Sequence, residues 1–391
     1  MKRVGILGGG QLGLMLAEAV QQLDAEAHVF DPDPGCPAAQ RLPHVVTAPW
    51  SDTAALARFA GACDVLTYEF ENVPAGPLRA LGTAVPILPS VDILETTQDR
   101  ILEKEFLRKE GLPVARFAAV REGDDARAAA ESIGFPLVVK TARGGYDGKG
   151  QHRVASADDL ARISDPRPWV LEETIEIAAE LSCIVARTAG GDELAFPLFE
   201  NEHLHHVLDL TLVPAGVAPG VADRVREVAL ASARAMGVVG LLTVEFFVGR
   251  SRRPEGGVRA GGFEIFVNEF APRPHNSGHV TRNACSLSQY DALARVLLGI
   301  PLTPPEPLAP GAFVMGNLLG DVWLAQGASG LDLDLSAWAR HPRVIDVYLY
   351  GKREARPRRK MGHLVVHAPD AEEALAAARA FRDDLAATRK R

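Results

Sequence analysis

A glycine-rich loop between two strand-like segments constrains the fold of this chain more than any other feature. An apolar strand ends in Lys140 and opens into the loop within FPLVVKTARGGYDGKGQ, residues 135–151. The loop glycines are Gly144, Gly145, Gly148 and Gly150. Glycines allow backbone N–H groups to close around phosphate oxygens, and Lys140 and Lys149 supply positive charge. Tyr146 and Asp147 at the tip favour a flap that reaches a substrate over the alternative, a flexible surface hairpin.

Two acidic residues lie further along in otherwise apolar strands. Glu245 is in LLTVEFFV and Glu269 is in IFVNEFAP. A buried acid without a partner costs on the order of several kcal/mol, so a cation or a hydrogen-bond network is expected, with a structural salt bridge as the alternative. Together with Asn268 these acids offer the oxygen ligands that Mg²⁺ prefers. Lysine, flap and paired acids in this order indicate an ATP-dependent ligase, and no GxxxxGK[ST] motif of Walker-type ATPases occurs.

Length and composition exclude several classes of protein. At 391 residues the chain is expected to form two or three domains, and its 47% hydrophobic content supports full cores. The net charge of −8 argues against general attraction to nucleic acid or to an anionic membrane. The cysteines are scattered without a CxxC pair, and no apolar run reaches the roughly 18 residues of a membrane span. We therefore expect a soluble, cytoplasmic protein without nucleic-acid or membrane partners.

The order of strand and helix patterns predicts three domains. Residues 1–98 alternate between the two patterns, which is typical of a small parallel-sheet α/β domain. Residues 99–300 form the expected central domain, with a flap subdomain at about 113–175, and a proline-rich linker leads into a β-rich domain at 301–391. The expected strands are 4–7, 27–31, 64–68, 85–88, 136–140, 169–173, 181–187, 344–350 and 363–367. The expected helices include 12–23, 222–236, 287–298 and 371–385.

The first strand ends in a second glycine-rich turn. Gly8, Gly10 and Gly13 match GxGxxG, and Asp31 ends the next strand at a dinucleotide-like distance. Alone, this pattern would indicate a nicotinamide-binding fold. The same turn serves many α/β domains that bind other anions, so a substrate-binding turn and plain tight packing stay open.

Three further polar stretches could serve a nucleotide or an anionic substrate. Backbone groups at 173–175 could bind an adenine edge and Glu180 ribose hydroxyls, unless this acidic run is a solvated face. His203 could reach the nucleotide or be structural. The run NEFAPRPHNSGH at 268–279 presents donors or caps a strand. The basic run at 350–363 suggests a phosphate clamp in an acidic protein, although a solvated strand pair is the simpler alternative.

Taken together, these residues resemble a known family, the ATP-grasp N5-carboxyaminoimidazole ribonucleotide synthases of purine biosynthesis. The resemblance covers nearly the whole chain. The motifs appear in family order as GGGQLG, TYEFENVP, TQDR, KTARGGYDGKGQ, EExxxxxxELS, FENEH, VEFF, NEFAPRPHNSGH and RKMGH. As a set, GGYDGKGQ, TYEFENVP and APRPHNSGH are highly specific, whereas each alone would be moderate evidence.

The resemblance implies a fold of α/β and α+β character and a concrete reaction. The fold would combine an N-terminal parallel-sheet pre-ATP-grasp domain, a central ATP-grasp fold and a small β-rich C-terminal domain. ATP would phosphorylate bicarbonate to carboxyphosphate beside Mg²⁺, with Mn²⁺ as an alternative ion. The amine of 5-aminoimidazole ribonucleotide would then be carboxylated, by carboxyphosphate or by CO₂ released from it. The family also implies a homodimer.

The resemblance assigns roles residue by residue. The implied ATP-binding residues are Arg100, Lys140, Gly145, Tyr146, Asp147, Gly148, Lys149, Gly150, Gln151, Glu172, Glu173, Thr174, Ile175, Glu180, His203, Asn268 and Glu269. The implied metal ligands are Glu245 and Glu269. The ribonucleotide residues would be Gln11, Leu12, Glu69, Glu71, Tyr146, Asp147, Arg273, Asn276, Lys352 and Arg359. The implied catalytic residues are Arg273, Lys140, Asp147 and Asn276.

Two departures from the family pattern and several rival functions remain. Arg358 stands where the family usually has glycine, and the Arg/Gly-rich loop 250–262 is longer than usual and is expected to protrude away from the chemistry.

The nearest rivals are sister ATP-grasp ligases, either a formate-dependent glycinamide ribonucleotide formylation enzyme or a biotin-carboxylating subunit. A nicotinamide-dependent oxidoreductase and a non-catalytic nucleotide-binding protein are rivals of other classes.

Overall fold

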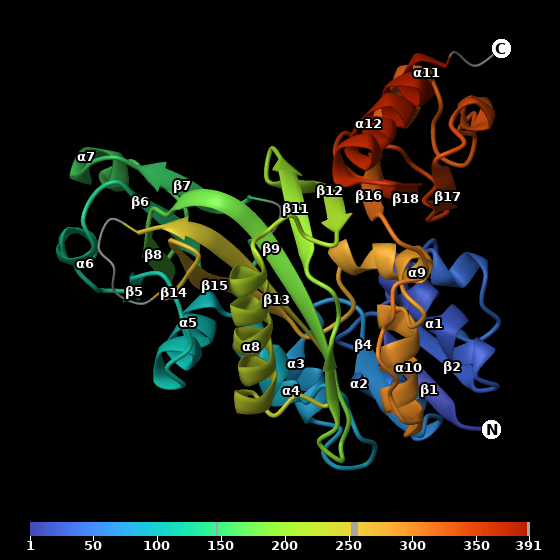
Figure 1. Ribbon diagram of the computed structural model, residues 1–391. Helices are drawn as coiled ribbons and strands as arrows, with labels where there is room; N and C mark the ends of the chain where they lie inside the picture. The colour runs from blue at the N-terminus through green and yellow to red at the C-terminus, as the bar shows by residue number, and fades with distance from the viewer. Residues whose placement is uncertain (146–147, 252–256, 389–391) are drawn as a thin grey trace.

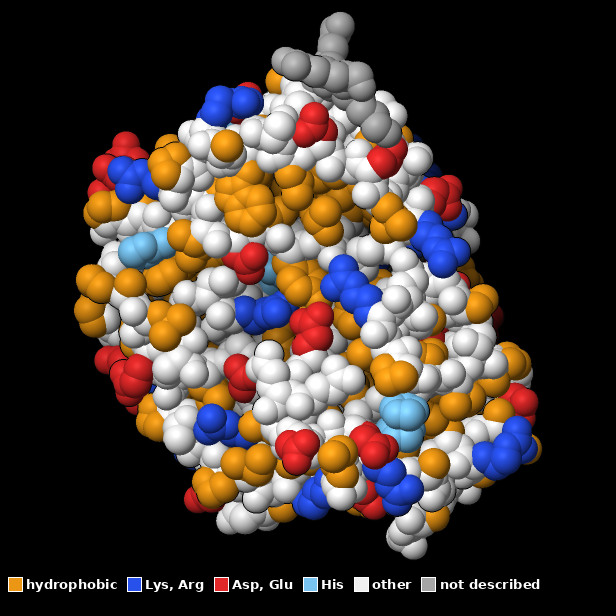
Figure 2. Space-filling model, turned by 90° about the vertical axis from the view of Figure 1, so that its right-hand side faces the viewer, with side chains coloured by type: hydrophobic (Ala, Val, Ile, Leu, Met, Phe, Trp, Pro, Cys, Tyr) orange, Lys and Arg blue, Asp and Glu red, His pale blue; other side chains and the backbone are white. Residues whose placement is uncertain are grey.

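The computed structural model describes residues 1–145, 148–251 and 257–388, and the described strands form three sheets (Figure 1). Tyr146, Asp147 and residues 252–256 of the Arg/Gly-rich loop lie outside the described residues. Within the described part of the chain, no helix combines the length and the apolar character that crossing a membrane requires. On the face shown in Figure 2, acidic and basic side chains are interspersed, and apolar side chains gather in its upper part.

The N-terminal sheet is parallel, as predicted, with the strand order β3-β2-β1-β4. Its strands are β1 (Arg3–Leu7), β2 (Glu26–Asp31), β3 (Val45–Thr47) and β4 (Val65–Tyr68). Its helices are α1 (Gln11–Gln22), α2 (Thr53–Gly61), α3 (Ala75–Arg79) and α4 (Val91–Thr97). Successive β2 residues point to opposite faces, so Val29 joins the core around α1 and Phe30 the core around α2. With both faces covered, the carboxyl ends of the strands are left to hold a site.

The second sheet carries the flap. Its order is β5-β8-β6-β7, with all pairs antiparallel. Its elements are β5 (Phe117–Val120), α6 (Ala126–Ile133), β6 (Leu137–Thr141), β7 (Gln151–Val154), α7 (Ala157–Ala161) and β8 (Trp169–Glu173). Lys140 of β6 is opposite Gln151 of β7, so the glycine-rich loop connects a hairpin at this point. The structure thus has the predicted order of an apolar strand followed by the glycine-rich loop.

The third sheet is large and runs through the central and C-terminal units. Its order is β14-β15-β13-β9-β11-β12-β16-β18-β17, with β10 beside β9. The strands are β9 (Glu176–Arg187), β10 (Glu193–Ala195), β11 (Phe199–Leu204), β12 (Val207–Val213), β13 (Gly240–Arg250), β14 (Val258–Ala260), β15 (Phe263–Ala271), β16 (Ala312–Leu319), β17 (Val344–Leu349) and β18 (Lys360–Ala368). Because β16 pairs with β12, the C-terminal strands continue the central sheet.

Capping residues in the sequence explain where several helices around this sheet begin and end. They are α5 (Arg100–Lys109), α8 (Pro219–Ala235), α9 (Thr281–Ala284), α10 (Gln289–Leu298), α11 (Gly320–Gln326) and α12 (Ala371–Ala387). Asp99 accepts from the backbone N–H of Ile101 at 2.9 Å and so caps α5. Ser288 and Asp291 form a capping box that begins α10, and Gly299, with a φ of 72°, ends it.

One apolar core joins all three parts of the chain. Leu16 of α1 and Leu293 of α10 belong to it, together with Met315 of β16 and Val365 of β18. Figure 1 shows α10 lying against α1 and β1, although nearly the whole central unit separates them in the sequence. The N-terminal unit is therefore tied to the rest by shared side-chain packing.

One predicted strand is wrong. Residues 85–88 do not form a strand, and an isolated parallel bridge joins Ile87 to Leu66 within β4. The apolar character of this run does reflect burial, because Val85 belongs to the core that contains Leu66. Pro86 and Pro89 flank the bridge, and proline cannot donate to a strand ladder, which limits the pairing.

Arg358, which departs from the family pattern, lies in a turn with a glycine-like backbone. Its φ of 61° lies in the left-handed region that glycine favours. Its backbone N–H donates to Oδ2 of Asp321 at 2.7 Å. The turn thus has the conformation that a glycine would take, with an arginine in its place.

A buried cluster of imidazole and phenol rings joins the central and C-terminal units. The rings of His279 and His363 stack with centroids 4.7 Å apart. His279 Nδ1 lies 2.7 Å from the hydroxyl of Tyr290, and His363 Nδ1 lies 3.0 Å from that of Tyr350. Burial lowers the pKa of His279 well below its ordinary value and lowers the pKa of His363 to about 3. Both rings are therefore neutral in the folded protein.

This cluster predicts acid sensitivity of the fold. Below an ordinary histidine pKa of about 6.5, the unfolded chain binds a proton at His363 that the folded chain does not bind until about pH 3. The neutral His363 ring therefore contributes its full share to the free energy of unfolding above pH 6.5, and this share is lost as the pH falls. At pH 5 the loss amounts to about 2 kcal/mol. Urea denaturation at pH 7 and pH 5 should show His363→Gln losing less stability between the two than the wild type. His367→Gln, on the same strand, should behave like the wild type; an unchanged pH dependence in His363→Gln contradicts the prediction.

Candidate active site

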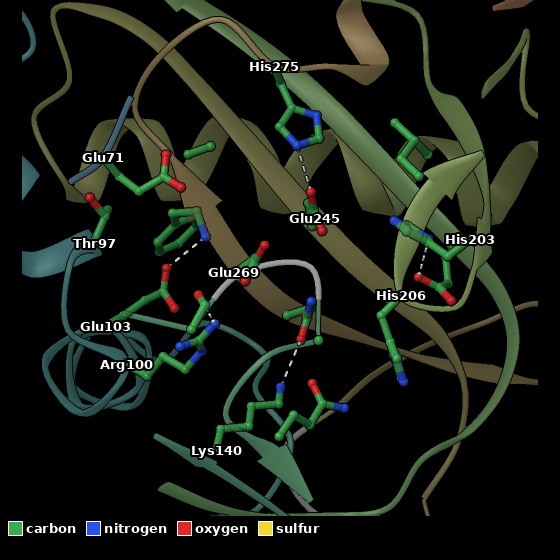
Figure 3. A pocket seen from close by; sticks show the side chains of 18 of the residues that line it. Glu71, Thr97, Arg100, Glu103, Lys140, His203, His206, Glu245, Glu269 and His275 are labelled. Atoms are coloured by element: carbon green, nitrogen blue, oxygen red, sulfur yellow. Dashed lines mark hydrogen bonds and ion pairs between the residues drawn. The ribbon is translucent and has the colours of Figure 1, made fainter. Parts of the chain in front are cut away.

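A cavity of about 790 Å³ lies where the N-terminal unit, the flap sheet and the large sheet meet. Figure 3 shows charged side chains from all three converging on it, with Glu269 near its centre. The cavity is lined by the loop after β4, the start of α5, the strands of the flap and the facing strands β13 and β15. The sequence motifs that lie far apart in the chain are thus neighbours in space.

A buried chain of opposite charges forms one wall of the cavity. Lys140 Nζ donates to Glu172 Oε2 at 3.1 Å and lies 3.4 Å from Asn268 Oδ1. On the other side, Lys104 Nζ lies 3.6 Å from Glu172 Oε1 and donates to the carbonyl of Asn268 at 2.8 Å. Burial opposes ionisation of Glu172, yet the charges of Lys104 and Lys140 outweigh it and hold its pKa at about 2. This wall places the side-chain nitrogen of Lys140 beside the cavity.

Strand pairing brings the two predicted metal ligands together. Glu245 of β13 and Glu269 of β15 are register partners in an antiparallel pair. Residues directly opposite in such a pair have Cβ atoms about 4.5–5.5 Å apart on one face of the sheet. The register shifts here, so that Asn268 is an extra residue on β15. Such a bulge re-aims side chains, and Asn268 and Glu269 both line the cavity.

The pKa values of the two carboxylates are shifted in opposite directions. His275 Nε2 lies 2.8 Å from Glu245 Oε1 (Figure 3), and although burial opposes it, this contact brings the pKa of Glu245 to about 2. Burial and the neighbouring charge of Glu245 raise the pKa of Glu269. Burial likewise raises the pKa of Glu103 to about 8, while its carboxylate accepts from the N–H of Phe270 at 2.7 Å. The site thus concentrates acidic groups that a cation would stabilise.

The opposite wall holds an ion pair next to the flap. His203 Nδ1 lies 2.9 Å from Glu180 Oε2, and this pair raises the pKa of His203 although burial opposes it. A Cβ added to Gly148 would come within 2.6 Å of His206, which lies in the turn between β11 and β12. The flap therefore packs closely against this turn, and only glycine fits there. Arg100 fixes the base of the flap through a 3.0 Å hydrogen bond to the carbonyl of Gly145.

The N-terminal glycine turn is occupied by carboxylates of the chain itself. Gly9 N–H donates to Asp31 Oδ2 at 2.6 Å, and Glu69 accepts from Gly10 and Gly13 at 2.8 and 2.7 Å. A dinucleotide phosphate would need these same donors. The nicotinamide interpretation of GxGxxG is therefore unsupported, and the turn instead places Glu69 at the cavity.

Most predicted site residues are brought together by the fold. Those that line the cavity are Gln11, Leu12, Glu69, Glu71, Arg100, Lys140, Gly145, Gly148, Gln151, Glu172, Glu173, Thr174, Ile175, Glu180, His203, Glu245, Asn268, Glu269, Arg273 and Asn276. Lys149, Gly150, Lys352 and Arg359 are described but do not line it. Tyr146 and Asp147 lie outside the described residues.

Sequence reasoning missed several lining or supporting residues. Glu103 and Lys104 are buried on the face of α5 that also buries Leu107. Their spacing of three and four residues from Leu107 was the available signal, because such spacings share one helix face. His206 and Arg153 also line the cavity and carried no comparable pattern. Lys360 lines it too, and it belongs to the basic run at 350–363 for which a phosphate clamp was predicted.

Comparison with protein families divides the chain in three. Residues 1–98 match the ribonucleotide synthetase preATP-grasp domain, residues 105–290 the ATP-grasp domain, and residues 313–377 the phosphoribosylaminoimidazole carboxylase C-terminal domain. Among curated relatives, the N5-carboxyaminoimidazole ribonucleotide synthase of Staphylococcus saprophyticus is 37% identical over 373 residues, covering 95% of this chain and 94% of its own. The bifunctional purine synthesis protein purC/E of Dictyostelium discoideum is 36% identical, and the chain spans only 36% of its length.

Solved structures of relatives are similar to this structure over nearly the whole chain. N5-carboxyaminoimidazole synthetase from Staphylococcus aureus, complexed with ADP, has a TM-score of 0.86 at 34% identity and covers 97% of both chains. N5-carboxyaminoimidazole synthase from Aspergillus clavatus, in complex with ADP and 5-aminoimidazole ribonucleotide, has a TM-score of 0.83 at 30% identity and covers 98% of both.

The buried charge wall yields a stability prediction. Lys104→Met should lower the free energy of unfolding by about 3–5 kcal/mol, because it removes one of the two buried cations beside Glu172 and the ammonium donor to the Asn268 carbonyl. Urea denaturation measures the loss. Lys109→Met, on the same helix but 80% exposed, should change stability by less than about 0.5 kcal/mol. Equal losses of unfolding free energy in the two variants would contradict the stabilisation assigned to the Lys104 contacts.

Proposed function

The chain belongs to the family of N5-carboxyaminoimidazole ribonucleotide synthases, and we propose that it carboxylates 5-aminoimidazole ribonucleotide with ATP and bicarbonate. The observation that carries the proposal is the single cavity that joins Lys140, Glu245 and Glu269 to the N-terminal residues Glu69 and Glu71. It provides a nucleotide end and a second, separately built end for another substrate. The products are ADP, phosphate and N5-carboxyaminoimidazole ribonucleotide, in purine biosynthesis.

The nucleotide end is formed by the flap and the large sheet. Lys140 places its ammonium group beside the cavity, where β- and γ-phosphate oxygens would accept from it. The segment 172–175 at the end of β8 offers backbone groups to adenine, and Glu180, held by His203, faces the same wall. Solved relatives were complexed with ATP and with ADP, which supports nucleotide binding in this chain.

The acidic pair fits a hard divalent cation. Glu245 and Glu269 supply carboxylate oxygens on adjacent strands, and Asn268, whose amide oxygen lies 3.4 Å from Lys140 Nζ, lines the same cavity. Burial and the neighbouring charge of Glu245 raise the pKa of Glu269, and such an ion would offset both effects. Mg²⁺, or Mn²⁺ in its place, would be held by these residues and would neutralise charge on the phosphoryl group in transfer.

The ribonucleotide end lies between the N-terminal unit and the loop after β15. Arg273 Nε contacts Glu71 Oε2, and both residues line the cavity. Both side-chain amide atoms of Asn276 are buried without a hydrogen-bond partner among the described residues, which leaves them available to a substrate. Lys352 and Arg359 lie outside the lining, and they are proposed to reach the substrate phosphate from the edge of the cavity.

Positioning and charge stabilisation account for the chemistry. An oxygen of bicarbonate attacks the γ-phosphorus and ADP leaves, with Lys140 and Arg273 supplying positive charge nearby. The exocyclic amine of the ribonucleotide then attacks the carboxyl carbon, directly on carboxyphosphate or after CO₂ is released; phosphate leaves and the amine loses a proton. The closed flap excludes water from the labile intermediate. A cytoplasmic homodimer is proposed from the family alone.

Product analysis tests the proposed reaction. ADP release should require ATP, Mg²⁺ and 5-aminoimidazole ribonucleotide, and bicarbonate should yield an acid-labile carboxylated product. ADP release with formate and glycinamide ribonucleotide instead would transfer the chain to the sister ligases. Turnover that no ribonucleotide stimulates would contradict both.

Glu269→Gln should abolish turnover, because it removes a charged oxygen ligand opposite Glu245. Steady-state ADP release measures the effect, and circular dichroism shows that the fold is kept. Glu264→Gln on the same strand is the matched control, since Glu264 is buried but does not line the cavity. Near-normal activity in Glu269→Gln would refute the metal assignment.

The phosphate role of Lys352 predicts a pH dependence. Burial, together with the charge of Arg359, lowers the pKa of Lys352 to about 8. The ammonium is therefore charged below pH 8 and neutral above it, so the KM for the ribonucleotide should rise above pH 8 while that for ATP does not. Lys352→Arg, which stays charged, should remove this rise, and Lys352→Ala should raise the ribonucleotide KM at pH 7. Equal damage to the ATP KM would refute the phosphate contact.

A further inference from the structure

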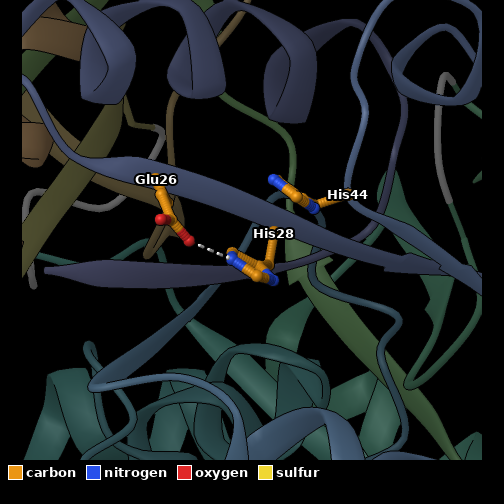
Figure 4. A group of neighbouring side chains, drawn as sticks. All are labelled: Glu26, His28 and His44. Carbon is orange, nitrogen blue, oxygen red and sulfur yellow. Dashed lines mark hydrogen bonds and ion pairs between the residues drawn. The ribbon is translucent and has the colours of Figure 1, made fainter. Parts of the chain in front are cut away.

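A second cluster of metal-binding side chains lies in the N-terminal sheet, apart from the cavity. It consists of Glu26, His28 and His44, whose nearest ligand atoms all lie within 4.8 Å of one another. Figure 4 shows the three side chains converging, with Glu26 and His28 on one strand and His44 on the neighbouring segment. None of them lines the cavity, and the proposed carboxylation does not use them.

The fold brings the cluster together by strand register. Glu26 and His28 are two residues apart on β2, so their side chains point to the same face. Val29 pairs with Val45 in the parallel register of β2 and β3, so His44, one residue earlier, is beside His28. The two imidazole rings stack with centroids 4.6 Å apart. The convergence is thus a property of the sheet itself.

We propose that Glu26, His28 and His44 form a binding site for a borderline divalent transition-metal ion, with Zn²⁺ as the principal candidate. Two imidazoles and a carboxylate are a ligand set that zinc takes in open sites, where water fills the fourth position. Around Zn²⁺ the ligand atoms would stand about 3.3 Å apart. Glu26 Oε2 and His28 Nε2 are already 3.0 Å apart, so mainly His44 has to turn.

The surroundings permit metal binding. His44 is exposed, and its ring, which stacks on His28, would turn toward the pair formed by Glu26 and His28. Arg3, the register neighbour of Glu26 on β1, is a positive charge that acts on Glu26. Its guanidinium lies 3.3 Å from Asp64 Oδ1, and this pairing reduces its repulsion of a bound cation. His28 is beside Gly5 on β1, which has no side chain to cover it.

Equilibrium dialysis of the metal-free full chain against Zn²⁺ tests the proposal, with excess Mg²⁺ present for the hard carboxylate site. His28→Gln and His44→Gln should each lose one equivalent of bound Zn²⁺, or bind it at least tenfold more weakly. His152→Gln, which removes an imidazole paired with Asp165, is the matched control and should keep that equivalent. His44→Gln should also leave carboxylation unchanged.

Imidazole NMR gives a second readout that does not depend on stoichiometry. Zn²⁺ should shift the ring signals of His28 and His44 together at one equivalent. Full Zn²⁺ binding by both His28→Gln and His44→Gln would overturn the proposal. So would the loss of all Zn²⁺ binding in Glu245→Gln, because the ion would then belong to the cavity.

Discussion

The site depends on the repulsion between two carboxylates that strand pairing forces together. Glu245 and Glu269 are opposite one another on β13 and β15, and both are partly buried in the cavity wall. Like charges in that position destabilise a sheet unless something compensates. His275 compensates the charge of Glu245, whereas burial and the nearby Glu245 carboxylate raise the pKa of Glu269. The cavity is in this sense prepared for a cation and for the phosphates that accompany it.

The other groups of the site keep that arrangement rigid. Lys104 connects α5 to Glu172 and to the backbone of Asn268. These contacts hold the bulge on β15 in place against α5. Glu69 accepts from the glycine turn of the N-terminal unit and thereby fixes the opposite end of the cavity. A reaction that relies on positioning more than on covalent catalysis benefits from such preorganisation, because misplaced groups cost rate.

The sequence predicted the strands and the site best where a motif is local. The flap hairpin, β8 and the two acid-bearing strands follow from apolar runs and glycines, and the parallel N-terminal sheet follows from alternation. The run at 85–88 fails as a strand because its flanking prolines limit pairing. Lys104 was missed since a buried lysine looks like any other on a charged helix. That β16 would join β12 could not be foreseen, because pairing between distant strands depends on the whole fold.

The shared core has a consequence for how the chain is made. Leu16 of α1 packs in the same core as Leu293 of α10 and Val365 of β18. During synthesis from the N-terminus, the apolar side of α1 leaves the ribosome long before those partners exist. The nascent chain therefore carries an unfinished core until almost its full length has been translated. Such incompletely packed chains are prone to aggregate, and this enzyme should be among the proteins that need a chaperone until their last strands arrive.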